Sequence, residues 1–231
     1  MEIVPGVHAI RKLGIGRAYL YAEADKLTLI DSGLPKSADK IFATIEALGR
    51  KPEDVRQVII THYHNDHAGS LADVVERSSA QVLAHPLDAP VLRGERPPAP
   101  AKTNVVIRRL LELTNPGGRA PAPVRVDREV SDGDEIDQDG GARVVHTPGH
   151  TPGSISIYLP QRRLLFAGDA AGNMLGLRPP VGWFTEDGAT ARASIARLAE
   201  LDFDVALLGH GKPLTKDAAA SFRKLAEKLA K

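Results

Sequence analysis

Short apolar runs alternate with amphipathic stretches along most of the first half of the chain. Such runs cover residues 18–22 and 27–30, and further strands are expected over 55–60 and 81–84. The first two runs are joined by a short polar link, which predicts a β-hairpin. Apolar positions at helical spacing predict helices over 37–48 and 71–77, and Gly49 is a normal end signal for the first.

The second half repeats this alternation. Strands are expected over 143–145, 154–159, 164–167 and 205–208. Helices are expected over 189–201 and 216–229. Two sets of strands with interspersed helices predict an α/β architecture in which sheets pack between helices. Without a visible repeat or linker, a single domain over 1–231 is the simplest division.

The middle of the chain has a different pattern. Prolines at 97, 98 and 100 precede a helical stretch over 104–113, and a segment rich in proline and glycine follows over 116–123. A helix between such connectors predicts an inserted helical flap over about 90–123. The alternative is a surface excursion without a function.

Composition and charge exclude several classes of protein. The 231 residues include no cysteine, which excludes disulfides, a thiolate metal site and a cysteine nucleophile. Lys+Arg 30 against Asp+Glu 29 gives a net charge of +1, which argues against a nucleic-acid partner. No basic segment followed by an apolar run opens the sequence, and no run reaches the roughly 18 apolar residues of a membrane span. We therefore expect a cytoplasmic protein without a membrane partner.

Candidate chemistry gathers directly after the strand predicted over 55–60. If the chain stays extended there, His62 and His64 point to the same side, because side-chain direction repeats every two residues. Two such imidazoles can bind one metal ion. Asp66 and His67 follow where the loop turns into the next helix, and they can bind a second ion. Imidazole and carboxylate ligands suit zinc, and also iron or manganese. The alternative is a solvated polar loop.

Three later side chains of ligand type also stand just beyond apolar strands: His150, Asp169 and His210. Each has a glycine beside it, which allows a sharp turn of the backbone. Alone, each would be an ordinary loop residue. Together with the cluster at 62–67 they complete two metal shells.

The pattern of these residues resembles that of the metallo-β-lactamase superfamily, whose hallmark motif His-x-His-x-Asp-His is present here at residues 62–67. The resemblance spans Asp31 to His210 and implies a four-layer αββα sandwich with the site at one edge of its two sheets. It also implies a division of ligands. The first metal would be held by His62, His64 and His150; the second by Asp66, His67 and His210; and Asp169 would bridge both. Asp66 and Asp169 are then the candidate catalytic carboxylates.

The resemblance also concerns Asp31, which matches the strand-end aspartate of the superfamily and is a candidate partner that orients a ligand imidazole. Its alternative is a turn residue before Gly33. Of the remaining histidines, His8 and His146 are expected to be structural. For His85 we favour an ordinary loop residue over a residue that lines the site.

The implied chemistry is hydrolysis. Two metals about 3.5–4 Å apart can share one water and lower its pKa toward neutrality. The resulting hydroxide would attack the carbonyl of a lactone, ester or thioester. The sequence lacks a Gly-x-Ser-x-Gly nucleophile elbow, which agrees with a mechanism that needs no serine.

A substrate pocket is expected after Asp169, where the chain is apolar. Its candidate lining residues are Met174, Leu175, Trp183 and Phe184. The alternative is that they pack under the helix that starts near 189. The flap could cover the same pocket or form a homodimer interface.

Three other functions stay open. The first is hydrolysis of a β-lactam or a phosphodiester, although the bridging Asp169 disfavours a dedicated β-lactamase under this resemblance. The second is an iron-dependent oxygenase that acts on a persulfide. The third is a non-catalytic metal-binding protein.

Overall fold

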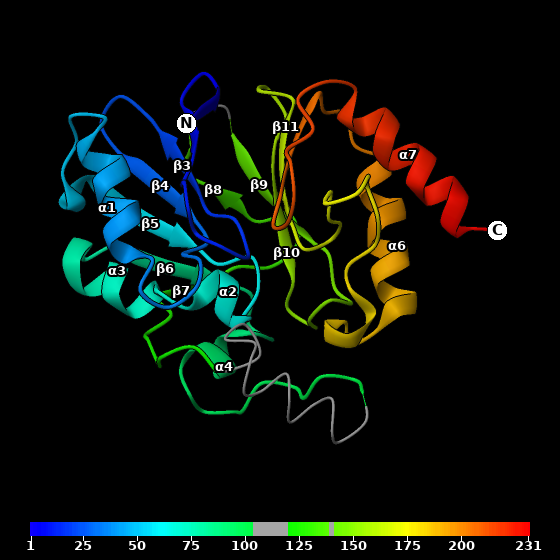
Figure 1. The fold of residues 1–231 in the computed structure, drawn as a ribbon, viewed down its shortest axis with the longest axis horizontal. Helices are drawn as coiled ribbons and strands as arrows, with labels where there is room; N and C mark the ends of the chain where they lie inside the picture. Colours follow the sequence, from blue (N-terminus) through cyan, green and yellow to red (C-terminus); the bar gives the residue numbers. More distant parts are fainter. Residues whose placement is uncertain (104–119, 139–140) are drawn as a thin grey trace. The chain divides into compact units, whose positions relative to one another are not determined.

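The computed structural model describes residues 1–103, 120–138 and 141–231. The chain divides into two compact units, Met1–Glu129 and Val130–Lys231 (Figure 1). The helix expected over 104–113, and with it much of the expected flap, lies outside the described residues. We describe each unit separately.

The first unit is built on a seven-stranded sheet in the order β1-β2-β3-β4-β5-β6-β7. Its strands are β1 Glu2–Val4, β2 Val7–Ala9, β3 Tyr19–Ala22, β4 Leu27–Ile30, β5 Val55–Ile59, β6 Gln81–Ala84 and β7 Arg128–Glu129. Pairing is antiparallel from β1 to β4 and parallel from β4 to β7. The predicted hairpin is therefore the β3–β4 pair, in which Tyr19 stands opposite Ile30.

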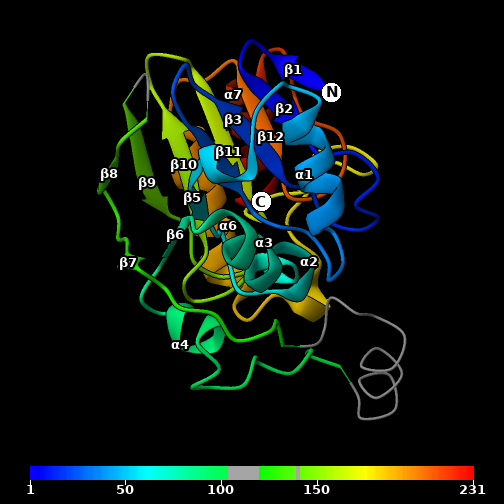
Figure 2. The ribbon, with the colours of Figure 1, turned by 90° about the vertical axis from the view of Figure 1, so that its left-hand side faces the viewer.

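The helices of this unit are α1 Ala38–Glu46, α2 Asn65–Ala68, α3 Leu71–Ser78 and α4 Ala89–Leu92, with a 3₁₀ turn over Pro52–Asp54. The apolar side of α1, with Ile41 and Phe42, and that of α3, with Val74, lie in one buried cluster with Leu29 and Val58 of the sheet. Figure 2 shows α1 and α3 from the side of this unit. Burial of these apolar faces explains why the sequence periodicity located both helices to within two residues at either end.

The second unit has a five-stranded sheet in the order β12-β11-β10-β9-β8. Its strands are β8 Glu135–Ile136, β9 Ala142–His146, β10 Ile155–Leu159, β11 Leu164–Gly168 and β12 Val205–Leu208. Only β11 and β12 pair in parallel. Its helices are α6 Gly188–Ala199 and α7 Ala218–Leu229, with a 3₁₀ turn over Gly182–Phe184.

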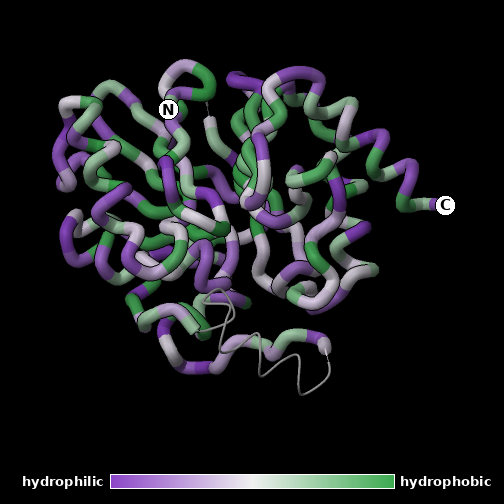
Figure 3. The backbone as a smooth tube through the Cα atoms, in the orientation of Figure 1, coloured by the Kyte–Doolittle hydropathy of each residue, from purple (hydrophilic) through white to green (hydrophobic). Residues whose placement is uncertain are grey.

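Helices α6 and α7 cover this second sheet with their apolar sides. Ile195, Leu198 and Phe222 lie in one buried cluster with Leu165 and Leu208. In Figure 3, hydrophilic and hydrophobic positions alternate along α7, as expected for a helix with one face in the core. The described helices include none that is long and apolar enough to cross a membrane.

Strand direction decides where the loops of interest lie. In the first unit β4, β5 and β6 are parallel, so the segments that follow them start at the same edge of the sheet. In the second unit β9 and β11 both run antiparallel to β10, and β12 is parallel to β11. The loops after β9, β11 and β12 therefore also share one edge. Every candidate metal ligand predicted from the sequence lies on one of these loops or on the short helix α2 that continues one of them.

Candidate metal centre

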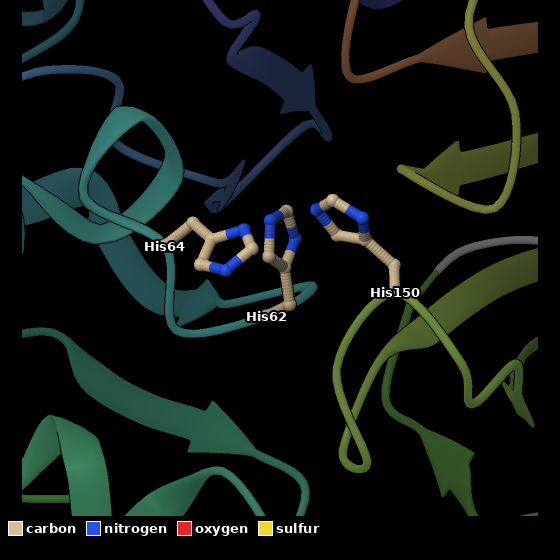
Figure 4. A group of neighbouring side chains, drawn as sticks. All are labelled: His62, His64 and His150. Carbon is tan, nitrogen blue, oxygen red and sulfur yellow. The ribbon is translucent and has the colours of Figure 1, made fainter. Parts of the chain in front are cut away.

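The first unit brings together the four side chains of the His-x-His-x-Asp-His segment. The ring centroids of His62 and His64 lie 4.8 Å apart, and those of His62 and His67 lie 4.1 Å apart. Figure 4 shows the His62 and His64 rings side by side on the loop that follows β5. Asp66 and His67 stand on α2, with His67 Nε2 3.8 Å from Asp66 Oδ2. This segment therefore offers three imidazoles and a carboxylate in one small region.

A buried carboxylate, that of Asp31, contacts this segment at two residues, Thr61 and His67. Its Oδ2 lies 2.7 Å from His67 Nδ1, and it accepts hydrogen bonds from the Thr61 backbone N–H and the Thr61 hydroxyl, each at 2.8 Å. Asp31 has a left-handed backbone, with φ +61°. Asp31 therefore contacts an imidazole, and that this imidazole is a metal ligand stays a prediction.

The Thr61 hydroxyl also contacts a second ligand candidate. Its Oγ1 lies 3.2 Å from His62 Nδ1. Because the hydroxyl gives its only proton to Asp31, it must accept from His62, so Nδ1 of His62 carries the ring proton. The lone pair of the neutral ring then lies on Nε2. The same holds for His67, whose Nδ1–H donates to Asp31.

A second buried carboxylate, Asp88, holds the backbone directly after His62. It directly precedes α4, is 1% exposed, and accepts the Tyr63 backbone N–H at 3.0 Å. The Tyr63 hydroxyl in turn accepts the Ala99 N–H at 3.2 Å. His85, from the same stretch, accepts the Leu87 N–H through Nδ1 at 3.2 Å. No local pattern in the sequence marked Asp88.

In the second unit, Asp169 lies between two histidines. Its Oδ2 is 3.1 Å from His210 Nε2 and 3.4 Å from His150 Nε2. Donors around a tetrahedral zinc with 2.0–2.1 Å bonds lie about 3.3 Å apart. The spacing of these atoms and the chemistry of the donors, imidazole nitrogen and carboxylate oxygen, therefore fit a divalent transition metal.

His150 is held by a tight loop after β9, where Figure 4 also labels it. Gly149 before it has φ +125°, and a Cβ on it would lie 2.2 Å from the backbone nitrogen of Ala191, so only glycine fits this close approach to α6. Thr185 Oγ1 donates to the Val181 carbonyl at 2.9 Å and lies 3.4 Å from His150 Nδ1. The Thr185 hydroxyl therefore accepts from His150 Nδ1, as the Thr61 hydroxyl accepts from His62 Nδ1, and the lone pair of the neutral His150 ring lies on Nε2. No local pattern in the sequence indicated this role.

The other singled-out residues have different surroundings. His146 contacts the Pro152 carbonyl through Nε2 at 2.8 Å, a structural contact as expected. Partial burial lowers the pKa of His8, which lies on β2. Met174, Leu175 and Trp183 are 75%, 83% and 51% exposed. The alternative that they pack under a helix is therefore wrong, whereas Phe184 is half-buried.

Comparison with known proteins identifies the family. Residues 11–210 match the metallo-β-lactamase superfamily, so the match runs through both units. The chain belongs to this superfamily, and the fold class expected from the sequence is confirmed. Side chains that could hold divalent metal ions, as members of this superfamily typically do, are present in both units.

Three relatives illustrate the range of similarity. The probable metallo-hydrolase YflN of Bacillus subtilis is 31% identical over 99% of this chain and 92% of its own length. The acyl-coenzyme A thioesterase MBLAC2 of Gallus gallus is 34% identical, over 52% of this chain and 44% of its own length. The crystal structure of a metallo-β-lactamase family protein from Thermus thermophilus shares the fold, with a TM-score of 0.74, 24% identity, and coverage of 99% of this chain and 79% of that one.

Proposed function

We propose that this protein is a dinuclear metal-dependent hydrolase that cleaves the acyl bond of a lactone, ester or thioester. The observation that carries the proposal is the position of Asp169 Oδ2, within 3.4 Å of both His150 Nε2 and His210 Nε2. A single carboxylate oxygen beside two imidazole nitrogens suits a ligand shared by two ions.

The proposed ligand set is the one that membership of the superfamily implies for these residues. One ion would be held by His62, His64 and His150, the other by Asp66, His67 and His210, with Asp169 shared. Zinc is the favoured metal for this mixture of donors, with iron or manganese as alternatives. When bound, such ions supply a water of lowered pKa and a Lewis acid for a carbonyl oxygen.

The side chains of this protein have separate tasks in the proposed reaction. Asp31 and Thr61 keep the Nε2 lone pairs of His67 and His62 available, and Thr185 does the same for His150. Asp66 is more exposed than His67, at 13% of its side chain against 0%. In the proposed reaction, Asp66 would accept the proton of the attacking water and pass it to the leaving group.

Support for an acyl substrate comes from the relatives and from the charge of the chain. The relative MBLAC2, which this chain matches over 44% of the length of MBLAC2, is an acyl-coenzyme A thioesterase. The net charge of +1 offers no general attraction for nucleic acid, so a phosphodiester in a polynucleotide is disfavoured. A small-molecule substrate is therefore proposed, and a homodimer stays a prediction.

Elemental analysis of purified protein, followed by activity assays on the same sample, tests this proposal. We expect two equivalents of metal and turnover of lactones, esters or thioesters. Asp169→Ala should lose at least one equivalent and this turnover while it stays folded. The exposed Asp202, whose side chain is 71% accessible, provides a matched control, since Asp202→Ala should keep both equivalents.

Other outcomes would replace the proposal. A single iron with oxygen consumption would favour the persulfide oxygenase, and selective turnover of β-lactams or phosphodiesters would favour those hydrolases. A fully metallated protein that is inactive on every substrate would favour a non-catalytic metal-binding protein. Unchanged metal content in Asp169→Ala would contradict the assigned ligand role.

A further inference from the structure

The loop between β11 and α6 exposes an unusual amount of apolar surface. Eight large hydrophobic side chains are exposed in the described part of the chain, and four of them lie in this loop: Met174, Leu175, Val181 and Trp183. Single exposed apolar residues are ordinary, whereas four on one short segment make that segment a candidate binding surface. We call residues 173–184 the apolar loop.

The start of the apolar loop is fixed to the segment that carries His210. Asn173 donates its N–H to the His210 carbonyl at 3.0 Å and accepts the Lys212 N–H at 3.1 Å. Gly211 allows this contact, because it has φ +88° and a Cβ on it would lie 2.2 Å from the Asn173 backbone. Gly172 and Arg178 exchange two backbone hydrogen bonds, so Met174 and Leu175 stand at the tip of a short hairpin.

The end of the apolar loop is fixed to the segment that carries His150. The Thr185 hydroxyl contacts His150 Nδ1, and its Oγ1 also donates to the Val181 carbonyl. The Glu186 N–H donates to the His150 carbonyl at 3.1 Å. The exposed apolar side chains therefore belong to a segment tied at both ends to candidate metal ligands of the same unit.

Two cations flank this surface. Arg178 closes the hairpin, and Lys212 follows the His210 segment; both side chains are exposed. Neither makes an ion pair within the described residues, in contrast to Arg163 and Arg197 of the same unit, each of which is bound by aspartate. Apolar side chains beside uncompensated positive charge suit a ligand with an apolar chain and an anionic group.

We propose that the apolar loop binds the acyl chain of a substrate whose leaving group is an anionic carrier, as in a thioester of a phosphorylated thiol. This inference rests on the proposed hydrolase function and names its substrate class. In the reaction the acyl carbon–sulfur bond breaks, the hydroxyl of water joins the acyl carbon, and the remaining proton goes to the thiolate. The products are a fatty acid and a free thiol.

Binding can be measured without catalysis, because Trp183 is the only tryptophan of the chain. The probes are non-hydrolysable alkyl thioethers of coenzyme A with two, eight and sixteen carbons. We expect a blue shift of the Trp183 emission with the longer chains. The affinity should rise with chain length, by up to about fourfold for each methylene that becomes fully buried.

Kinetics of the metal-loaded enzyme give the second measurement. In Met174→Ser/Leu175→Ser, the KM for hexadecanoyl-coenzyme A should rise at least tenfold more than the KM for acetyl-coenzyme A. Arg178→Gln should raise the KM for coenzyme A thioesters more than for uncharged p-nitrophenyl esters. Leu48→Ser changes an exposed leucine near the end of α1 in the other unit, and it should leave both KM ratios as in the wild type.

The outcomes separate this inference from the proposed function. Chain-dependent binding without hydrolysis of any ester would retain the acyl site and overturn the hydrolase. Hydrolysis with equal KM values for all chain lengths, and no chain-dependent emission, would retain the hydrolase and overturn the acyl site. The acyl site is also overturned if the emission responds only to protein concentration, which indicates a dimer, or equally to phosphatidylcholine vesicles, which indicates a lipid surface.

Discussion

At the scale of single residues, the candidate centre depends on which group donates the proton in each hydrogen bond to a histidine Nδ1. Thr61 and Thr185 lie in different units, yet each gives its hydroxyl proton to a fixed oxygen and so accepts from a histidine Nδ1. A neutral imidazole held in this way has its lone pair on Nε2, the form that a metal requires. Removing such a hydroxyl should therefore weaken metal binding without touching a ligand.

Thr61→Val tests this at one position. The substitution keeps the shape of the side chain and the backbone N–H that Asp31 accepts, but it removes the hydroxyl. We expect metal affinity to fall about 10- to 100-fold, and Thr61→Ser to restore most of it. Competition with a chromogenic chelator measures the affinity. Thr44→Val is the control, since the Thr44 hydroxyl only contacts the Lys40 carbonyl on α1. Equal metal affinities for Thr61→Val and wild type would refute the role of the Thr61 hydroxyl in orienting His62.

Sequence alone predicted the candidate ligands but not the residues that orient most of them. His62, His64, Asp66 and His67 are recognisable because their spacing is local and follows a strand. Thr185 and Asp88 reach their partners across 35 and 25 residues of sequence, and nothing near them in the chain signals that contact. Such contacts depend on tertiary folding.

At the scale of elements, the start of α6 connects helix stability to the His150 loop. Asp187 caps the helix by accepting the N–H groups of Ala189 and Thr190, at 2.9 and 3.0 Å. Its own N–H donates to the Gly149 carbonyl at 2.8 Å. One residue therefore satisfies free backbone donors of the helix and fixes the turn that carries His150.

Asp187→Ala should lower the free energy of unfolding by about 1 kcal/mol, the usual cost of losing a capping side chain. Urea unfolding followed by circular dichroism measures the change. Asp187→Asn keeps an acceptor at the same place and should recover most of the loss. If alanine and asparagine destabilised equally, the loss would have to come from the negative charge and not from the cap.

The elements that were predicted differ from those that were missed mainly in length. Strands such as β10, β11 and β12 are continuous buried runs, so hydrophobicity alone located them. The strands β1, β2, β7 and β8 have only two or three residues each. Segments of this length carry almost no periodic signal, and they are strands because a neighbouring strand pairs with them.

At the scale of the whole molecule, the proposed ligands are divided between the two units. Four lie in Met1–Glu129 and three in Val130–Lys231. An ion held by these side chains would bind the folded chain and not the unfolded one, so it should raise the stability of the folded protein.

Removal of metal should therefore lower the melting temperature. At a free metal concentration about 100 times the Kd, binding contributes about 2.7 kcal/mol, and each kcal/mol corresponds to about 2–4 °C for a chain of this size. Calorimetry before and after chelation measures this shift of roughly 5–10 °C. Re-addition of zinc should reverse it, and Asp169→Ala should show a smaller shift. Identical melting curves for both forms would argue against metal binding by the folded chain.

The fold class could be predicted because the ligand motif and the strand pattern extend over most of the chain. The division into two compact units was not visible, since no linker separates them and β7 is followed directly by Val130. A single domain over 1–231 stays a prediction, and so does the role of the insertion over 90–123.

The backbone of Asp31 has a consequence for the evolution of the chain. A non-glycine residue in the left-handed region costs on the order of 1 kcal/mol or more, and glycine would relieve that strain. The same exchange would delete the carboxylate that contacts His67 and Thr61. Glycine would leave the buried Thr61 N–H and hydroxyl without their acceptor, which costs more stability than the relieved strain returns, so a search for thermostable variants should leave this position alone.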